Sequence, residues 1–486
     1  MTAIVSSLTG ASSSEAIWRS INWKTIEAEV RQLQIRIAKA VREGRHGKVK
    51  SLQWLLTHSF SAKLFAVNRV VKNKGGKTPG VDKVIWKTPQ QKLKAAQSLK
   101  RKSYKTQPLR RIYIPKKDGR KRPLSIPCMQ CRAMQALYLL ALEPLSEFYA
   151  NKNSYGFRPK RSCADALEVC CITLSKRYSS QWILEADIKS CFDKISHPWL
   201  LNNVPMDKQI LKKWLAAGYI DKGINYQTES GTPQGGIASP TLLNLTLNGL
   251  EEAVIKATSV RRDKVHLSIY ADDFIITGAS KEVLEQKVKP VVEAFLKERG
   301  LELSKNKTKI THIDDGFNFL GINVRKYKGK YLSKPSKESV KNFLASIREI
   351  IKLNPTAKTE SLIHLLNPKI RGWANYYKHS SAKQTFAYVD HFIYEALWHW
   401  IHRRHPRKSG GWQKKKYFRC HNLRNWIFSA KTSNNQGTET YVDLFAASSV
   451  AIKRYIKIKA DATPFDPLYA EYFEKREQFS SISARH

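Results

Sequence analysis

The chain has 486 residues, of which 42% are hydrophobic and 10% aromatic. That is ample apolar material for buried cores, so it excludes a disordered chain. Its 85 Lys and Arg residues against 40 Asp and Glu residues give a formal net charge of +45. This charge excludes an ordinary enzyme of small neutral metabolites and indicates nucleic-acid binding, because cations that contact phosphates release condensed counterions.

Seven cysteines without regular spacing indicate a reducing compartment rather than a disulfide framework. No apolar run approaches the ~18 residues that a membrane span requires, and the N-terminus lacks the basic region of a signal peptide. We therefore expect a soluble cytoplasmic protein without a membrane partner. The oligomeric state stays open.

The N-terminal region is expected to be helical. Apolar residues recur at steps of three and four over residues 24–43, which predicts an amphipathic helix that Gly44 ends. A second helix follows Gly47, with Lys and Arg residues on its outer face. That basic face is either an ordinary solvated surface or a contact for RNA, and both interpretations stay open.

A β-hairpin is expected between Leu109 and Ile126, because an Asp-Gly pair at 118–119 lies between two runs of alternating apolar residues. The hairpin carries seven cations: Arg110, Arg111, Lys116, Lys117, Arg120, Lys121 and Arg122. So many charges cannot form an apolar sheet face. They suit a triphosphate or the backbone of a template strand.

The middle of the chain mixes helices with strands. The expected elements are a helix over 130–148, a strand over Trp182–Ile188, a helix over 282–299 and strands over Phe317–Val324 and Tyr331–Leu332. Beyond Lys337 the chain is expected to be mostly helical. The pattern predicts an α+β core with helical appendages at both ends.

The segment from His266 to Thr277 holds two adjacent carboxylates, Asp272 and Asp273, between two apolar runs. The runs predict two strands with the carboxylates at the tight turn between them. Two carboxylates in so apolar a turn repel each other, and a bound cation resolves this repulsion. Phosphoryl transfer commonly uses two metal ions ~3.5–4 Å apart, and magnesium prefers carboxylates together with substrate phosphates.

A third carboxylate supports this interpretation. Asp187 ends the expected strand at 182–188, which a neighbouring hairpin can bring beside Asp272. Between the two segments, Gly231-Thr-Pro-Gln-Gly-Gly236 forms a turn whose glycines let a nucleotide approach closely. Three carboxylates around two metal ions are therefore expected.

Taken in this order, the segments resemble those of group II intron-encoded reverse transcriptase-maturases, and the likeness covers nearly the whole chain. The matching segments are Thr78–Asp82, Asp187, Thr232–Gly236, Ser239–Asn244, Tyr270–Asp273 and Ile370–Tyr377. Lys83 stands where the family usually has glycine. The last segment resembles the maturase signature, which simpler reverse transcriptases lack.

The resemblance implies roles for individual residues. Asp187, Asp272 and Asp273 would be catalytic and would hold two Mg²⁺ ions together with the backbone carbonyl of Ile188. Phe192 would exclude a 2′-hydroxyl beneath the incoming sugar. The other implied nucleotide-binding residues are Lys116, Arg122 and Gln234, and the implied primer grip is Phe319, Leu320 and Gly321.

The C-terminal third interleaves aromatic rings with cations, a composition typical of RNA binding because rings stack on exposed bases. About half of these rings are expected to be core. The candidate RNA-binding residues are Arg371, Trp373, Tyr376, Tyr377, Arg403 and Arg404. The HNH endonuclease that many relatives carry after a stretch like Ile456–Pro467 is expected to be absent.

We therefore expect an α+β right-hand polymerase with a helical N-terminal extension and a helical maturase domain. The expected domains are residues 1–60 (tail and extension), 61–333 (fingers and palm), 334–365 (thumb) and 366–486 (maturase and DNA-binding domain). The resemblance implies an RNA-directed DNA polymerase that binds its group II intron RNA, assists splicing and copies the intron from deoxynucleoside triphosphates into target DNA during retrohoming. Two alternatives are a reverse transcriptase diverted to CRISPR spacer acquisition or phage defence, and a non-enzymatic RNA-binding splicing cofactor.

Overall fold

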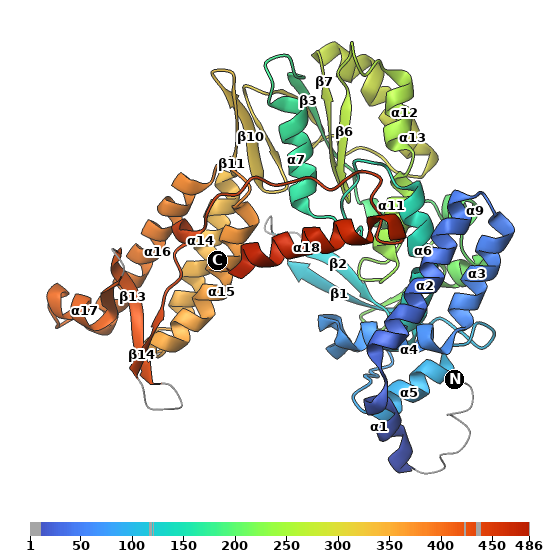
Figure 1. Cartoon of the computed structure of the whole chain (residues 1–486), viewed down its shortest axis with the longest axis horizontal. Coiled ribbons are helices and arrows are strands. Elements are labelled where there is room, and N and C mark those ends of the chain that lie inside the picture. The colour runs from blue at the N-terminus through green and yellow to red at the C-terminus, as the bar shows by residue number, and fades with distance from the viewer. Residues whose placement is uncertain (1–10, 116–118, 120, 422–423, 434–438, 486) are drawn as a thin grey trace. The chain divides into compact units, whose positions relative to one another are not determined.

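The computed structural model describes residues 11–115, 119, 121–421, 424–433 and 439–485, and it contains two compact units (Figure 1). The first unit comprises Met1–Ala166, Leu184–Lys309 and Ile458–His486. The second comprises Leu167–Ile183 and Ile310–Lys457. Within the described part of the chain, no helix combines the length and apolar character needed to cross a membrane.

Helices form the N-terminal part of the first unit. They are α1 (Ala11–Ser20), α2 (Trp23–Arg42), α3 (His46–His58), α4 (Phe60–Lys72) and α5 (Pro89–Ser98). The helix expected over 24–43 is confirmed as α2, whose first turn is capped by the Asn22 side chain. Helices α2, α3 and α4 all pack on α6 (Met129–Tyr149), which is buried along most of its length. This helix is the centre of the local core.

The expected basic hairpin is also confirmed. Strands β1 (Leu109–Pro115) and β2 (Lys121–Ile126) pair antiparallel and belong to a four-stranded sheet of order β2-β1-β4-β5. Strands β4 (Tyr219–Asp221) and β5 (Ile224–Tyr226) complete this sheet. The tip of the hairpin, including Lys116, lies outside the described residues.

A second four-stranded sheet has the order β6-β7-β3-β8. Its strands are β6 (His266–Tyr270), β7 (Asp273–Gly278), β3 (Trp182–Asp187) and β8 (Lys309–His312). Other helices of the central segments are α7 (Cys163–Leu174), α8 (Cys191–Lys194), α9 (His197–Asn203), α10 (Lys208–Leu215), α11 (Ser239–Leu247), α12 (Leu250–Ala257) and α13 (Lys289–Glu298), the last preceded by the π-helical turn η3 (Val283–Val288). Strand β3 is mostly buried, as its apolar run predicts.

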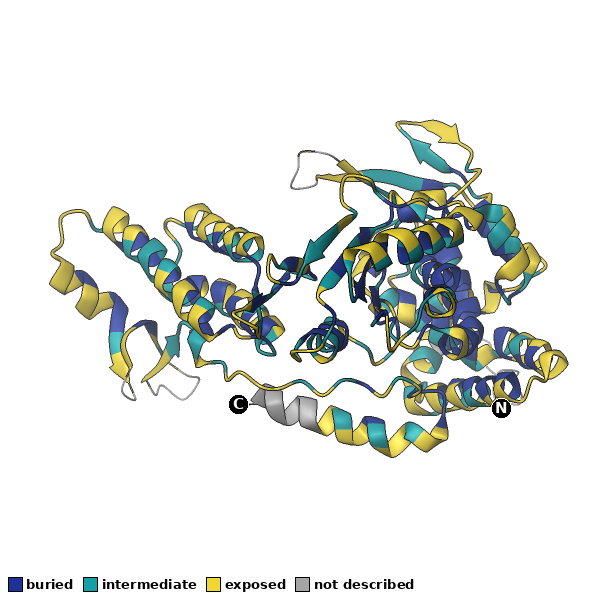
Figure 2. Cartoon of the chain, turned by 90° about the horizontal axis from the view of Figure 1, so that it is seen from above, coloured by how far each residue is buried: buried dark blue, intermediate teal, exposed yellow. Residues whose placement is uncertain are grey.

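The second unit begins with a three-stranded sheet of β9 (Phe317–Phe319), β10 (Ile322–Tyr327) and β11 (Lys330–Pro335). The single strand expected over Phe317–Val324 is wrong: Leu320 and Gly321 both have positive φ and turn the chain back on itself. Helices α14 (Lys337–Leu353), α15 (Thr359–Tyr377), α16 (Lys383–Arg404) and α17 (Gly410–Tyr417) follow. Each of the first three buries one face, and Figure 2 shows buried and exposed residues alternating along them.

Beyond Lys337 the chain is mostly helical, as expected, but it also contains three strands that the sequence analysis did not predict. Strands β12 (Phe418–His421), β13 (Arg424–Ser433) and β14 (Glu439–Asp443) form an antiparallel sheet after α17. Residues Ile427 to Ala430 of β13 are buried in succession, so the strand lacks a clean alternation of apolar and polar positions.

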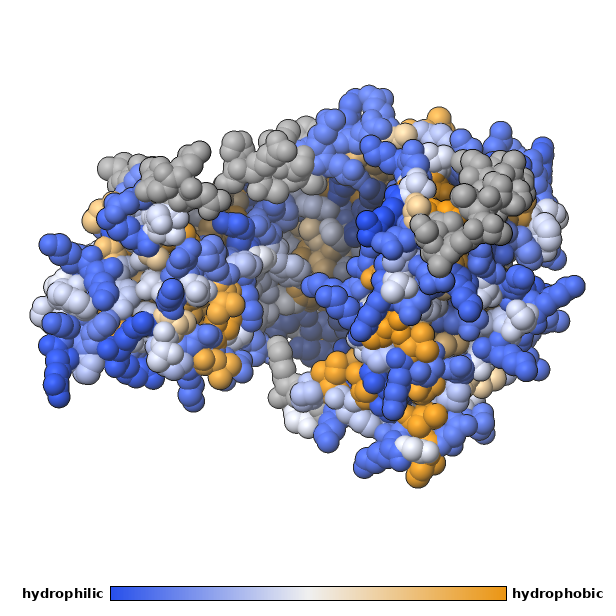
Figure 3. All heavy atoms as spheres, turned by 90° about the horizontal axis from the view of Figure 1, so that it is seen from below, coloured by the Kyte–Doolittle hydropathy of each residue, from blue (hydrophilic) through white to orange (hydrophobic). Residues whose placement is uncertain are grey.

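Hydrophilic residues cover most of the molecular face seen in Figure 3, with separate apolar patches between them.

Buried ionic groups lie near the C-terminal segment of the first unit, Ile458–His486. Glu147, with 3% of its side chain exposed, pairs with Arg158 at 2.8 Å and with Arg161 at 2.9 Å. The fully buried Asp165 accepts hydrogen bonds from the Ile458 amide (2.8 Å) and from the Arg476 guanidinium (3.0 Å). The turn η5 (Pro467–Tyr469) and helix α18 (Ala470–Arg485) continue this segment.

Candidate active site and RNA-binding residues

A tight turn carries the adjacent aspartates. Strands β6 and β7 pair so that Tyr270 lies opposite Asp273, which leaves Ala271 and Asp272 as the turn. Ala271 has a φ of 59°, the left-handed conformation typical of two-residue hairpin turns. Strand β3 lies beside β7 and ends at Asp187, close enough that its charge acts on both other carboxylates.

The backbone at Gly156 abuts this turn, a contact that sequence reasoning missed. The Tyr155 amide donates to the carbonyl of Ile269 at 2.9 Å. A Cβ on Gly156 would lie 2.2 Å from the Ala271 nitrogen, so only glycine fits there. An isolated glycine between two helices was the only available signal.

Loss of hydration and mutual repulsion both oppose ionisation of the adjacent aspartates. Loss of hydration, together with the charges of Asp272 and Asp187, raises the pKa of Asp273 to about 6, although the residue itself stands at the surface. Loss of hydration and the charge of Asp187 also raise the pKa of Asp272, against the opposing charges of Arg122 and Lys307. The Lys307 ammonium lies 3.1 Å from both carboxylate oxygens of Asp187. Lys307 is thus part of the site, although the sequence analysis did not single it out.

The donor set fits a divalent cation. As they stand, the described residues contain no group of three His, Cys, Asp or Glu side chains close enough to bind a metal ion. Neighbouring carboxylates oppose each other's ionisation. A hard cation, which prefers oxygen ligands, stabilises their charged forms. Ile188 lies opposite Leu303 in an isolated antiparallel β-bridge. The hydrogen bonds of this bridge join the Lys189 amide to the Glu302 carbonyl and the Ser304 amide to the Asp187 carbonyl. The bridge therefore does not engage the Ile188 carbonyl.

The Gly231–Gly236 segment brings two predicted nucleotide-binding residues into the same unit as the aspartates. The Ser125 amide of β2 donates to the carbonyl of Gln234 at 2.8 Å, and Arg122 on the same strand is the cation that acts on Asp272. Gly235 has a φ of 122°, and a Cβ there would lie 2.9 Å from the Ser125 oxygen. Glycine therefore lets this segment lie along β2.

Phe192 lies in α8, a few residues after Asp187. Its carbonyl accepts a hydrogen bond of 2.6 Å from the Thr232 amide, so the same glycine-rich segment also contacts α8. The half-buried Phe192 ring meets the exposed Phe157 ring edge-on, with centroids 6.5 Å apart. The backbone of Phe192 is thus tied to the glycine-rich segment, while its ring contacts Phe157.

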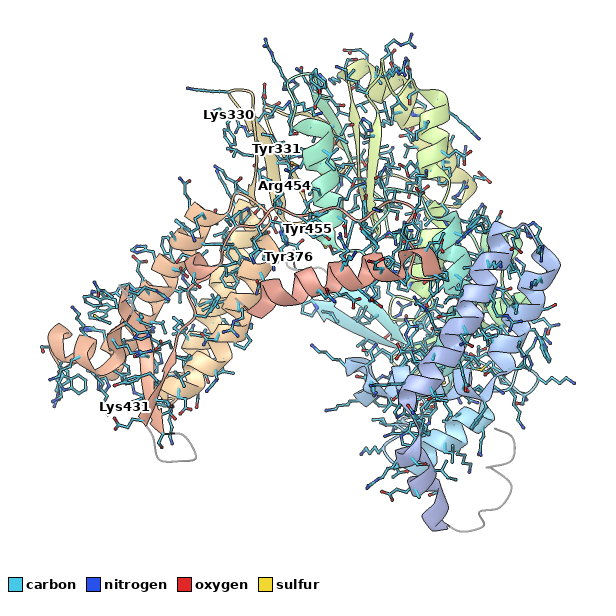
Figure 4. The ribbon with its side chains drawn as sticks, in the orientation of Figure 1. Lys330, Tyr331, Tyr376, Lys431, Arg454 and Tyr455 are labelled. Carbon is cyan, nitrogen blue, oxygen red and sulfur yellow. The ribbon has the colours of Figure 1, made fainter. Side chains whose placement is uncertain are left out.

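The predicted primer-grip residues form the turn between β9 and β10 in the second unit. Tyr376, labelled in Figure 4, donates its hydroxyl to the carbonyl of Leu320 at 2.8 Å. The Gly321 carbonyl accepts hydrogen bonds from the Ser336 amide (2.9 Å) and from the Tyr377 hydroxyl (3.3 Å). Helices α14 and α15 thus hold the turn in place.

The candidate RNA-binding residues divide into buried and exposed ones. Tyr377 is 5% exposed, and the Trp373 ring stacks on Phe343 with centroids 4.6 Å apart. Tyr377 is therefore buried and Trp373 half-buried among neighbouring rings, and RNA binding by these two residues stays a prediction. The exposed candidates are Arg371, Tyr376, Arg403 and Arg404. Arg371 lies over the Phe445 ring, which keeps its charge at the surface.

The family comparisons agree with this geometry. Residues 114–324 match the reverse transcriptase (RNA-dependent DNA polymerase) family, residues 18–99 the N-terminal domain of reverse transcriptase, and residues 340–418 the group II intron maturase-specific domain. Protein YkfC of Escherichia coli is 32% identical over 335 residues, which cover 59% of this chain and 87% of that protein. The group II intron-encoded protein LtrA of Lactococcus lactis is 30% identical over 356 residues, 59% of each chain.

The chain therefore belongs to the group II intron-encoded reverse transcriptases, and it is an RNA-directed DNA polymerase with a maturase domain. The expected α+β right-hand polymerase is confirmed. Enzymes of this family generally use divalent metal ions. A telomerase structure from Candida albicans overlaps 63% of the chain with a TM-score of 0.37 and 11% identity, too weak a likeness to add to this assignment.

Proposed function

We propose that the chain binds its own group II intron RNA, assists its splicing and copies it into DNA at a target site. The observation that carries the proposal is the presence, in one chain, of an intact carboxylate site and a maturase-specific domain. Binding alone would need no crowded aspartates, because their repulsion costs stability. A net charge of +45 supplies the attraction for RNA and DNA backbones.

In this proposal two Mg²⁺ ions are held by the carboxylates of Asp187, Asp272 and Asp273, and the backbone carbonyl of Ile188 is a further ligand. The ions would activate the attacking primer oxygen and stabilise the leaving group. The Lys307 ammonium would compete with the ions for the Asp187 oxygens that it contacts.

Three residues support selection of a deoxynucleoside triphosphate. Arg122 contributes positive charge near the Asp272 carboxylate, where a triphosphate needs it. Gln234 lies along β2 next to this charge. The Phe192 ring limits the space beneath the sugar, so a ribose 2′-hydroxyl would collide with it. The nucleotide is thereby selected by sterics rather than by a hydrogen bond.

Replacing Phe192 with alanine tests this selection. Phe192→Ala should raise the rate of ribonucleotide incorporation relative to deoxynucleotide incorporation at least tenfold, measured by single-nucleotide primer extension on an RNA template. The matched control is Phe157→Ala, which removes the neighbouring exposed ring. An unchanged ratio in folded, active Phe192→Ala protein would remove the ring from the selection.

RNA binding by the maturase domain rests on its exposed residues. Arg371, Arg403 and Arg404 are cations on the surfaces of α15 and α16. Charge at a regular helical surface suits the phosphates of a folded RNA. Splicing chemistry belongs to the intron itself, so the protein needs only to bind the active RNA fold more tightly than other folds.

Arg371→Gln combined with Arg403→Gln tests this surface. The double variant should weaken intron binding and slow splicing at low magnesium, while extension of a short primer on a generic template stays within about twofold. Lys256→Gln with Lys281→Gln removes the same charge from exposed positions of the first unit and serves as the control. Equal loss in both double variants would show a general charge effect instead of a maturase surface.

A further inference from the structure

A basic cavity of about 370 Å³ lies in the first unit, and none of the three aspartates lines it. Its lining comes from α3, α4, α6 and the turn after α5. Helices α3 and α4 both pack against α6 (Figure 1). Leu99, Met134 and Leu137 supply apolar lining. A neighbouring cavity of about 360 Å³ shares Trp54 and His58 with it. Trp54 and His58 thus line both cavities, as do Thr57, Arg101 and Tyr138.

Trp54 and His58 form a stacked pair of aromatic rings. The Trp54 and His58 rings lie 4.2 Å apart between centroids, with 21° between their planes. The His58 Nδ1 atom is 2.8 Å from the Trp54 carbonyl oxygen, which fixes the imidazole beneath the indole. Trp54 nonetheless remains 61% exposed. A large, oriented aromatic surface in contact with water is what a nucleic-acid base stacks on.

The lining of the cavity also carries three lysines, Lys63, Lys100 and Lys102, that have no acidic partner among the described residues. Burial and the charge of Lys100 lower the pKa of Lys63, which means that two ammonium groups crowd each other. Arg101 is already engaged by Asp207. An anion would relieve the crowding of the lysines.

We propose that this cavity binds one unpaired nucleotide of a single strand, with its base on Trp54 and its phosphate among the three lysines. Apolar lining, an exposed ring and unpaired cations together match the three parts of such a ligand. A small metabolite would not need so basic a rim, and an apolar peptide would leave the lysines unsatisfied. The inference rests on the proposed function only in taking nucleic acid as the ligand.

The test measures binding of a short oligouridylate RNA and of the matching oligothymidylate DNA by fluorescence anisotropy. Trp54→Ala should weaken binding about 5- to 150-fold, and Trp54→Phe should restore most of the loss, because a phenyl ring still stacks. Lys63→Gln should weaken binding and reduce the slope of log Kd against log salt by about one. A larger effect on the RNA than on the DNA would identify the strand as RNA, and equal effects would indicate either strand.

Two matched controls lie on the same helix. Leu55→Ala removes an exposed apolar residue next to Trp54, and Lys48→Gln removes an exposed charge, yet neither residue lines either cavity. Both variants should bind like the wild type. Because the chain has other basic surfaces, an oligouridylate containing 5-iodouridine locates the contact: its photocrosslink should map to the peptide that contains Trp54.

Specific results would overturn the proposal. Trp54→Ala that binds and crosslinks like Leu55→Ala, with an unchanged circular dichroism spectrum, removes the cavity from nucleic-acid binding. Free uridine monophosphate that binds as tightly as the oligouridylate and abolishes the crosslink would make the cavity a mononucleotide site instead. Primer extension by the same preparations is a separate readout: a wild-type protein that extends no primer refutes the proposed function and leaves the cavity result standing.

Discussion

Gly156 offers a test of how the catalytic turn is held. A Cβ at this position would lie 2.2 Å from the Ala271 nitrogen and 2.9 Å from the Tyr270 carbonyl carbon, whereas ordinary contacts begin near 3.4 Å. Both partners are backbone atoms of the turn, so the turn itself must move by roughly 1 Å in Gly156→Ala. A misplacement of that size in a catalytic site costs about 10²-fold in rate. The overpacking should also cost about 1–3 kcal/mol of stability.

The assay is primer extension on an RNA template at saturating deoxynucleotide and magnesium. Gly156→Ala should lower kcat about a hundredfold while the circular dichroism spectrum stays that of the wild type. Gly47→Ala is the control, because nothing lies within 4 Å of a Cβ added there. Wild-type kcat in Gly156→Ala would refute the argument that the backbone contact at residue 156 positions Asp272.

Three further predictions concern stability and the primer-grip turn. Glu147→Gln leaves Arg158 and Arg161 without their buried carboxylate and should cost about 3–5 kcal/mol of unfolding free energy in a urea titration, against no change for the exposed Glu252→Gln. Tyr376→Phe removes the hydrogen bond to Leu320, so it should cost about 0.5–1.5 kcal/mol and shorten extension products, while Tyr388→Phe on α16 should do neither. The pKa of Asp273 is raised to about 6 from an ordinary value near 3.9, so the folded state binds this proton more tightly than the unfolded one. With a chelator present, its contribution to stability should therefore fall as pH rises from about 4 to 6, and the difference in melting temperature between wild type and Asp273→Asn should change in that window and be constant above it.

The sequence was most informative where local pattern and chemistry agree. Apolar runs on both sides of Asp272 and Asp273 leave a hairpin turn as the natural solution, and the strand before Asp187 follows the same logic. The helix over 24–43 was predicted because its apolar spacing is a local signal. In each case nothing distant in the chain was needed.

The parts that were missed depend on tertiary structure. Leucine gives no signal for the positive φ that Leu320 adopts, so one expected strand became two. The burial of Tyr377 and the packing of Trp373 depend on Phe343 of α14 and Phe386 of α16, which pattern alone does not bring together. Gly156 likewise shows its role only when the Ala271 backbone is seen against it.

The central claim is that one chain has a polymerase site and a separate intron-binding surface. Asp272→Asn keeps the size of the side chain but removes a carboxylate charge from the turn, and it leaves the exposed cations of α15 and α16 untouched. The measurement is cDNA synthesis and intron-RNA affinity on the same preparation of this variant. We predict that synthesis falls by several orders of magnitude while the dissociation constant for intron RNA stays within about twofold of the wild type. Parallel loss of both activities in folded protein would contradict the account.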